Sequence, residues 1–214
     1  MNSKELTIVI VTFKSDEKII NCLNSIAKEI PVVVVENSNN EKFKKKIENN
    51  FQNVKCILTG ENLGYSKANN IGLNLVTTKY ALILNPDTTL EKNAIKNFFA
   101  LVNLIKDFWL LGPSKDQMIN LDFKGKNIIE VDNLKGFALF FNISKFNNKY
   151  FDENFFLFFE EIDLCKRVKK SEGKIYLSNE IIINHEGASS VDKKNMLELE
   201  KNRNWHWMWS TFYF

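Results

Sequence analysis

Four apolar runs divide the first half of the chain into a regular alternation. Residues 6–11 and 32–35 are almost wholly β-branched, and residues 54–58 and 80–84 form two shorter runs. Such runs, without strict alternation of polar and apolar positions, are typical of strands that are buried on both faces of a parallel sheet. The pattern therefore predicts four strands of one sheet.

Helical patterns lie in the first and third intervals between these runs and after the fourth run. Apolar residues recur at spacings of three and four after the first run, at Ile19, Leu23, Ile26 and Ile30, and after the fourth, at Ala94, Phe98, Leu101 and Ile105. Ser15 or Asp16 can cap the first of these helices. A further helix is predicted over residues 65–76. Alternating strands and helices indicate an α/β fold with an open, Rossmann-like, mostly parallel sheet and helices on both faces.

The second half of the chain has a mixed α+β pattern. Strands are predicted over residues 109–113, 127–131, 134–142, 173–178 and 181–185, and a helix over residues 160–170. The chain has no linker rich in Pro, Gly or Ser, so we expect the second half to be built onto the first within one domain, residues 1–192. Residues 193–214 form a separate, aromatic and helical C-terminal segment in this interpretation.

Composition excludes several classes of protein. With 214 residues, 44% hydrophobic residues and 26% charged residues, the chain has the composition of a globular protein rather than a disordered one. The net charge of +3 and the presence of only two arginines, Arg167 and Arg203, argue against nucleic acid as a partner. Three widely spaced cysteines fit a reducing compartment, and we see neither a signal peptide nor a membrane-spanning run. We therefore expect a cytoplasmic protein.

The carboxyl ends of the first four predicted strands carry polar residues, and ligands of open parallel sheets bind at that edge. The strands end in Thr12-Phe13, Glu36-Asn37, Gly60-Glu61-Asn62 and Asn85-Pro86-Asp87. Glu36 can accept hydrogen bonds from a ribose or a base, or it can cap the segment that follows. Asn62 and Gly64 begin a helix whose N-terminus attracts phosphate, or they simply cap it. Together these strand ends predict a binding site.

Asp87 is the sharpest candidate among them. Pro86 ends the strand and presents the Asp87 carboxylate at the sheet edge. Oxygen ligands suit Mg²⁺ or Mn²⁺ bridging to a diphosphate. The alternative is that Asp87 caps the following helix.

Two features of the second half add further candidates. Residues 155–159 are apolar, four of them aromatic, and run directly into Glu160, Glu161 and Asp163. Burial against such a wall can leave one acid poised as a general base, although acids in a first helical turn also complement the macrodipole. His185 ends another predicted strand, where it can bind a metal or phosphate or serve a structural role.

The order of these motifs resembles a known family. The segments TF, VEN, NLGYSKANN, LNPD, GFALFF, FDENFFLFFEEIDLCKR and NHEGASS resemble a family 2 glycosyltransferase of the GT-A fold, and within it the rhamnosyltransferase-like branch. This resemblance implies that Asp87 and His185 hold a divalent cation, Mn²⁺ or Mg²⁺. It also implies a nucleotide-sugar site and a catalytic base at Glu161. The residues expected to bind the nucleotide sugar are Thr12, Phe13, Glu36, Asn37, Asn62, Gly64, Asn85 and Gly136.

Three positions depart from the family pattern. Asn85 stands where many GT-A enzymes have an acid, and Glu36 replaces a more usual Asp. Glu161 replaces the Asp of the ED-x-D motif, which displaces the base by about one bond length. Glu160 and Asp163 therefore stay candidates for the base.

The resemblance implies an inverting transfer by single displacement, from a dTDP- or UDP-sugar, with rhamnose as the first guess, to a glycan or lipid-linked acceptor. Two alternatives stay open. One is a degenerate subunit that binds a nucleotide sugar without transferring it. The other is a nucleotidyltransferase, for which the expected basic, glycine-rich loop after the first strand is missing.

The C-terminal segment is unusually aromatic. Three of the four tryptophans, Trp205, Trp207 and Trp209, fall within it, and Lys193 and Lys194 precede them. A terminal helix of this composition either packs across the core or lies in a membrane interface. We expect peripheral contact with the inner face of the cytoplasmic membrane as the functional alternative.

Overall fold

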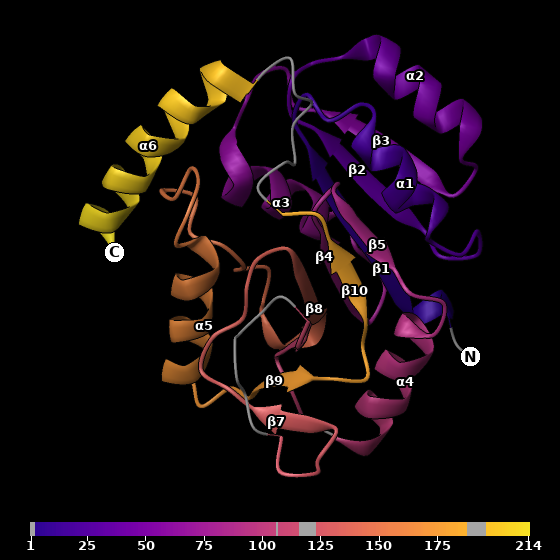
Figure 1. The fold of residues 1–214 in the computed structure, drawn as a ribbon, viewed down its shortest axis with the longest axis vertical. Helices are drawn as coiled ribbons and strands as arrows, with labels where there is room; N and C mark the ends of the chain where they lie inside the picture. The colour runs from indigo at the N-terminus through magenta and orange to yellow at the C-terminus, as the bar shows by residue number, and fades with distance from the viewer. Residues whose placement is uncertain (1–2, 106, 116–122, 188–195) are drawn as a thin grey trace.

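In the computed structural model, the described residues are 3–105, 107–115, 123–187 and 196–214. Within these ranges, eight strands form one sheet in the order β3-β2-β1-β4-β8-β6-β9-β7, and two form a small second sheet, β10-β5 (Figure 1). The strands are β1 Leu6–Thr12, β2 Val32–Glu36, β3 Val54–Leu58, β4 Tyr80–Leu84, β5 Thr88–Leu90, β6 Leu110–Pro113, β7 Ile128–Glu130, β8 Ala138–Asn142, β9 Ile175–Ser178 and β10 Ile183–His185.

The large sheet joins a parallel half to a mixed half. β1 pairs in parallel with β2 and β4, and β2 pairs in parallel with β3. β8 runs antiparallel to both β4 and β6, β9 is parallel to β6, and β7 is antiparallel to β9. In this register Thr12 lies opposite Glu36, so the carboxyl ends of the parallel strands meet at one edge. The expected α/β fold, with an open sheet and a mixed second half, is confirmed.

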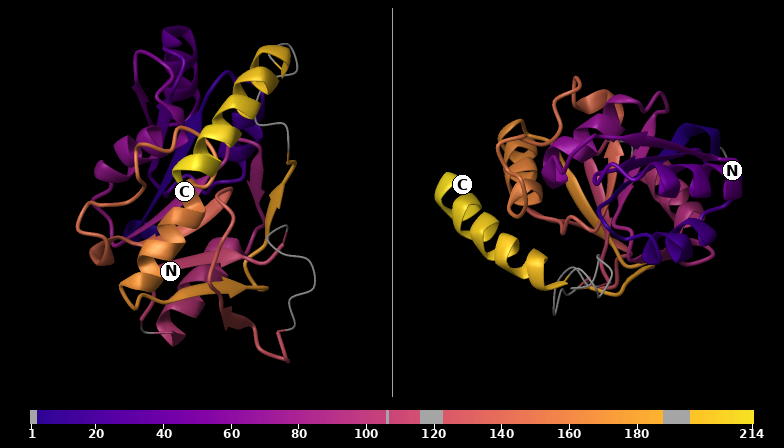
Figure 2. Two further views of the ribbon diagram at one scale, coloured as in Figure 1. Left: turned by 90° about the vertical axis from the view of Figure 1, so that its left-hand side faces the viewer. Right: turned by 90° about the horizontal axis from the view of Figure 1, so that it is seen from above.

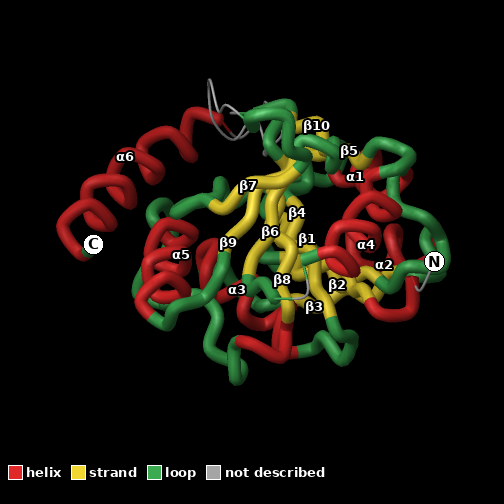
Figure 3. The backbone as a smooth tube through the Cα atoms, turned by 90° about the horizontal axis from the view of Figure 1, so that it is seen from below, coloured by secondary structure: helices red, strands yellow, loops and turns green. Residues whose placement is uncertain are grey.

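Helices cover both faces of the sheet (Figure 3). They are α1 Lys18–Asn24, α2 Glu41–Asn50, α3 Gly64–Asn74, α4 Ala94–Leu104 and α5 Glu160–Lys170. α1, α2 and α4 pack on one face through residues such as Ile19, Phe43 and Phe98. α3 and α5 pack on the other through Leu73 and Leu164. The two apolar cores therefore lie on opposite sides of the same strands.

Two helices differ from the sequence prediction. The first ends at Asn24, and Ile26 and Ile30 are buried within the turns that follow it. Their apolar spacing thus reflects burial rather than continued helix. α2 lies in the interval between the second and third strands, for which no helix was predicted, and its inner side buries Phe43 and Ile47.

The segment after Asp87 also differs from the prediction, which placed a helix directly there. β5 follows instead and pairs antiparallel with β10, so that Thr88 lies opposite His185. α4 begins only at Ala94, after the N-cap residue Asn93. Asp87 therefore does not cap a helix, and the β5–β10 pairing brings it beside His185 although the two are far apart in sequence.

The C-terminal helix α6, Met196–Tyr213, lies at the periphery of the molecule, outside α5 (Figure 2). Lys193, Lys194 and the expected boundary at residue 192 fall outside the described residues. No helix in the described part of the chain combines the length and the apolar character that crossing a bilayer requires.

Candidate active site

A cavity of about 540 Å³ opens at the carboxyl edge of the parallel strands. Its walls come from the ends of β1, β2 and β4, from the start of α3, from residues 156–158 and from α5 and α6. Most of the residues singled out in the sequence line it together, namely Phe13, Asn37, Asn62, Gly64, Asn85, Gly136, Glu160, Glu161 and His185. Thr12, Glu36, Asp87 and Asp163 are not among the lining residues. The cavity thus gathers residues from across the whole sequence.

Asn37 and Asn62 fix the start of α3. The Asn37 amide donates to the Asn62 side-chain oxygen at 2.9 Å, and Asn62 accepts from the backbone N–H of Gly64 at 3.1 Å. The Asn37 side-chain oxygen accepts from the backbone N–H of Leu63 at 2.9 Å. These bonds hold the N-terminus of α3 toward the cavity, where an anion is favoured.

Glu36 and Thr12 lie behind the cavity wall. The Glu36 carboxylate accepts hydrogen bonds from the backbone and the hydroxyl of Ser38 and from the backbone N–H of Asn40. It thereby orders the turn from β2 into α2. The Thr12 hydroxyl is buried and makes no hydrogen bond to the described residues.

Asp87 and His185 form a pair at the junction of β5 and β10. The His185 Nε2 atom lies 3.4 Å from the Asp87 Oδ1 atom, and the Asp87 side chain is fully buried. Neither carboxylate oxygen of Asp87 accepts a hydrogen bond from the described residues. The His185 ring stacks on Phe137 with a centroid distance of 4.6 Å, which fixes its orientation.

This pair fits a hard divalent cation. A buried carboxylate without hydrogen-bond donors carries a large desolvation cost that a bound cation would offset. No group of three or more His, Cys, Asp or Glu side chains that could hold a metal ion is present in the described ranges. Asp87 and His185 would thus leave coordination positions for water or for oxygens of a ligand, as Mg²⁺ sites that bind substrate phosphates do.

Glu160 and Glu161 begin α5 on another wall of the cavity. Burial, and secondly the neighbouring Glu161 carboxylate, raise the pKa of Glu160 well above its ordinary value. Burial raises the pKa of Glu161 as well. A Cβ placed on Gly136 would lie 3.8 Å from the Glu161 carboxyl carbon, so Gly136 leaves that carboxyl open to the cavity. Next to them, the Tyr65 hydroxyl donates to the Gly136 carbonyl at 2.6 Å.

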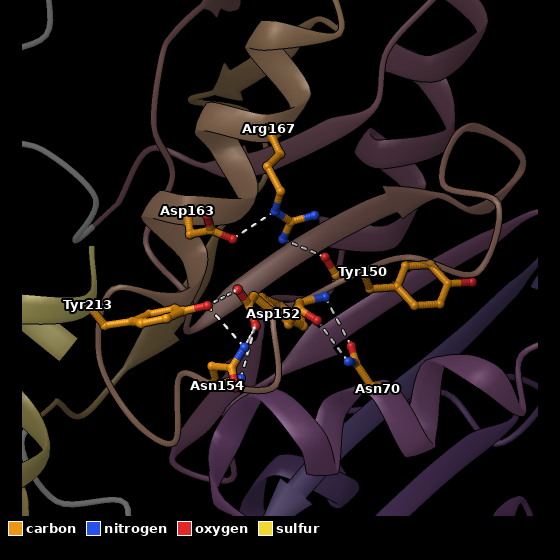
Figure 4. A network of polar contacts seen from close by, with 8 residues as sticks. Asn70, Tyr150, Asp152, Asn154, Asp163, Arg167 and Tyr213 are labelled. Atoms are coloured by element: carbon orange, nitrogen blue, oxygen red, sulfur yellow. Dashed lines mark hydrogen bonds and ion pairs between the residues drawn. The ribbon is translucent and has the colours of Figure 1, made fainter. Parts of the chain in front are cut away.

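Asp163, the third acid of this helix, makes a structural ion pair. Its carboxylate accepts from the Arg167 Nε atom at 2.7 Å, and the same guanidinium donates to the Tyr150 carbonyl at 2.6 Å (Figure 4). The pair therefore connects α5 to the segment at Tyr150, which precedes the aromatic residues 155–159, called the aromatic run below. In this arrangement Asp163 faces Arg167 rather than the cavity.

The aromatic run adopts a strained backbone before α5. Phe158 and Phe159 have φ values of 73° and 68°, in the left-handed region that bulky side chains rarely occupy. The backbone N–H of Tyr65 donates to the Phe156 carbonyl at 2.7 Å. Such strain persists only where surrounding contacts enforce it, and it concentrates at functional sites.

Several cavity residues were missed in the sequence. Tyr65 follows the recognised Asn62–Gly64 motif, and Lys135 precedes Gly136, so each lies next to a residue that was chosen. Arg203 and His206 come from α6, which was interpreted as a core cover or a membrane anchor. No local pattern signals their position, because it depends on how α6 packs against residues 156–158.

A mostly parallel sheet with helices on both faces and a cavity at its carboxyl edge is the architecture of the GT-A fold. The chain belongs to glycosyl transferase family 2, whose model matches residues 7–164. Among curated proteins it is 26% identical over 193 residues to the low-salt glycan biosynthesis hexosyltransferase Agl10 of Haloferax volcanii, covering 78% of this chain and 62% of that protein. It is 28% identical over 130 residues to the teichoic acid poly(glycerol phosphate) polymerase of Staphylococcus epidermidis, covering 55% of this chain and 18% of the polymerase.

Solved structures share the fold at low sequence identity. S. aureus TarS 1–349 in complex with UDP-GlcNAc has a TM-score of 0.67 at 18% identity, covering 87% of this chain and 60% of that one. GalNAc-T7 with UDP, GalNAc and Mn²⁺ has a TM-score of 0.71 at 12% identity, covering 84% and 42%. The chain thus spans less than two thirds of the length of these relatives. The expected family and the GT-A fold are confirmed, whereas the rhamnosyltransferase-like branch stays a prediction.

Proposed function

We propose that this protein transfers a sugar from a nucleoside-diphosphate donor to a hydroxyl of a glycan or lipid-linked acceptor. The observation that carries the proposal is that His185, paired with the buried Asp87, and Glu161 line one cavity at the carboxyl edge of the sheet. A uridine diphosphate donor is favoured by the solved relatives that contain UDP or UDP-GlcNAc. A dTDP-sugar is the alternative donor, and rhamnose is the first candidate for the sugar.

Asp87 and His185 would hold a divalent cation, Mn²⁺ or Mg²⁺. A cation bound there supplies positive charge that stabilises the departing diphosphate. The presence of Mn²⁺ in the GalNAc-T7 structure is consistent with this assignment. Asn37 and Asn62 hold the N-terminus of α3 in place, and that terminus favours the same negative charge.

Glu161 would act as the general base. Its carboxylate takes the proton of the acceptor hydroxyl as that oxygen bonds to the anomeric carbon from the face opposite the diphosphate. The bond between the anomeric carbon and the diphosphate breaks, and the electron pair leaves with the diphosphate, so the configuration inverts. Because a diphosphate leaves without protonation, one essential carboxylate suffices, unlike the acid and base pair of a glycosidase.

The outer face of α6 would contact a membrane surface that carries the acceptor. Trp205, Trp209 and Phe212 are 59%, 49% and 89% exposed and share one side of the helix at spacings of four and three. Exposed tryptophans favour the headgroup region of a bilayer. We place the protein in the cytoplasm, peripherally associated with the inner face of the cytoplasmic membrane.

This localisation is testable with vesicles. The wild-type chain should co-sediment with liposomes that contain anionic lipid, and a variant with Trp205, Trp209 and Phe212 changed to Ser should stay in the supernatant. The melting temperature of the variant shows whether it is still folded. If the wild-type chain sediments with neither anionic nor neutral liposomes, the membrane assignment is wrong.

The donor assignment is tested by thermal shift with nucleoside diphosphates and nucleotide sugars, with and without Mn²⁺, since a ligand that binds the native state stabilises it. We expect UDP or dTDP to raise the melting temperature, and more so with Mn²⁺. No shift with any nucleotide would contradict the proposal. A shift without later donor turnover would favour the alternative of a degenerate, binding-only subunit, and release of pyrophosphate from a nucleoside triphosphate would favour a nucleotidyltransferase.

A further inference from the structure

One face of α6 is directed toward the rest of the molecule, and its residues Arg203 and His206 line the cavity. Arg203, His206, Ser210 and Tyr213 follow one another at spacings of three, four and three, which places them on a single side of the helix. This face is distinct from the exposed face that carries Trp205, Trp209 and Phe212. α6 thus turns these four residues toward the molecule and Trp205, Trp209 and Phe212 away from it.

Specific contacts fasten the inner side to the aromatic run. The Ser210 hydroxyl, which is fully buried, donates to the Leu157 carbonyl at 2.8 Å. The Tyr213 hydroxyl donates to the Asp152 carboxylate at 2.9 Å, and Asn154 donates to the same hydroxyl (Figure 4). These bonds fix α6 relative to the segment that leads into α5. Because α6 is held by these hydrogen bonds, the positions of Arg203 and His206 beside the cavity are fixed as well.

Arg203 presents a charged group to the cavity. Its guanidinium lies 5.7 Å from the centroid of the Phe158 ring, a cation–π contact that orients the planar group. Among the residues whose side chains the structure describes, which do not include 196–202, no carboxylate forms an ion pair with it. A guanidinium held in this way keeps its paired N–H donors available for a bidentate contact with phosphate oxygens.

His206 extends the polar lining of the cavity beside Arg203. The His206 ring stacks on Phe156 with a centroid distance of 4.1 Å, and it lines the cavity beside Arg203. Burial lowers the pKa of His206, so the imidazole is a neutral hydrogen-bonding group at neutral pH. Lys14 and Lys135 also line the cavity.

We propose that Arg203 and His206 form a diphosphate-binding subsite at the α6 side of the cavity. The C-terminal helix, which lies beyond the matched residues 7–164, would thereby complete the site. This inference rests on the proposed function, because the cavity is the same one. The diphosphate can come from the nucleotide donor or from a lipid-linked acceptor, and both present the same pair of phosphate groups.

Calorimetric titration separates the two sources. The variants are Arg203→Gln and Arg203→Lys, with Asn204→Ala as the control, since Asn204 is an exposed neighbour on the same helix. The probes are UDP and UMP in the presence of Mn²⁺, and farnesyl diphosphate and farnesyl monophosphate as carriers of a lipid phosphate. We expect Arg203→Gln to weaken the binding of one diphosphate by about tenfold while its monophosphate changes little. Arg203→Lys should fall between, and Asn204→Ala should match the wild type.

Each outcome has a defined meaning. A selective loss of UDP affinity assigns the subsite to the donor, and a selective loss of farnesyl diphosphate affinity assigns it to the acceptor. If the wild type binds either diphosphate and folded Arg203→Gln binds it equally well, the subsite proposal is wrong while the proposed function stands. If the wild type binds no diphosphate at all, both proposals fail.

Discussion

At the scale of single residues, Asp87 combines burial with an absence of hydrogen-bond donors. Its side chain is fully buried and its nearest described polar contact is His185, at 3.4 Å. A buried carboxylate in this state lowers the free energy of unfolding relative to a neutral group of the same shape. Such a cost is expected where a residue is retained for ligand binding rather than for stability.

Replacing Asp87 by Asn should separate the stability cost of the buried carboxylate from its role in binding a metal ion. Without metal, we expect Asp87→Asn to raise the free energy of unfolding by about 1 kcal/mol, because a buried charge is removed. The Mn²⁺-dependent part of the stabilisation by UDP should disappear. Urea denaturation and thermal shift measure the two quantities, and Asp132→Asn, at a carboxylate whose side chain is 81% exposed, is the control. Unchanged Mn²⁺ dependence in Asp87→Asn would rule out its role as a ligand.

Glu161 should carry the proton transfer. We expect Glu161→Gln to retain donor binding and to lose at least about 100-fold in turnover, the lower end of what a general base contributes. Because burial raises the pKa of Glu161, wild-type turnover should increase with pH above the ordinary carboxyl range and then level off. Near-normal turnover of Glu161→Gln, together with a collapse in Glu160→Gln, would move the base to Glu160.

At the scale of secondary-structure elements, the start of α3 packs closely against Phe156 of the aromatic run. Gly64 has a φ of +79°, and a Cβ at that position would collide with the Phe156 backbone and ring. Gly64→Ala should therefore destabilise the fold by about 2 kcal/mol or more, through a strained φ plus a steric clash, and should weaken UDP binding.

Gly60 provides the matched control for this substitution. It has a φ of +85°, but a Cβ there would meet nothing within 4 Å. Gly60→Ala should cost only the left-handed backbone conformation, about 1 kcal/mol, and should leave UDP binding intact. Equal effects of the two substitutions in thermal unfolding and calorimetry would show that the contact with Phe156 is unimportant.

Strands and helices could be predicted from the sequence where a run or period of apolar residues matches the residues that are buried in the structure. β1, β2 and β4 are buried along their whole lengths or nearly so, and their apolar runs were recognisable. β5 has only three residues, and its existence depends on pairing with β10, so no local signal identified it. α2 carries so many polar residues that its two buried positions, Phe43 and Ile47, gave too weak a period.

The site residues also divide into those that a local sequence signal predicted and those whose place depends on tertiary contacts. Candidates at strand ends, such as Asn37 and Asn85, could be named because topology alone brings the ends of parallel strands together. Arg203 and His206 could not, since their place depends on tertiary contacts of α6 such as the bond from Ser210 to Leu157. The hydrogen bonds that hold Glu36 behind the wall also depend on the fine geometry of a turn.

At the scale of the whole molecule, the two adjacent acids at the start of α5 should make stability depend on pH. Burial raises the pKa of Glu160 well above 4.5 and also raises that of Glu161. Between the ordinary and the raised pKa values, the folded state binds more protons than the unfolded state. The contribution to stability is therefore fully present below the ordinary pKa and is lost as pH rises through the folded pKa.

The variant Glu160→Gln isolates this contribution. Urea denaturation in metal-free buffer between about pH 5 and about pH 8 should show wild-type stability falling with pH more steeply than that of Glu160→Gln. The variant should be the more stable of the two at the upper end. Glu29→Gln, at an exposed acid, should keep the wild-type slope. Parallel slopes for wild type and Glu160→Gln would contradict the assigned burial of this carboxyl group.

The most direct test of the account is donor cleavage by the whole protein. Competent glycosyltransferases slowly release nucleoside diphosphate from their donor when no acceptor is present. With UDP-GlcNAc, UDP-glucose and dTDP-rhamnose as probes, we predict Mn²⁺-dependent release of UDP or dTDP from at least one of them, abolished by Asp87→Asn. A wild-type protein that binds these donors but releases no diphosphate, with or without a glycan acceptor, would contradict the claim that the cavity transfers sugars.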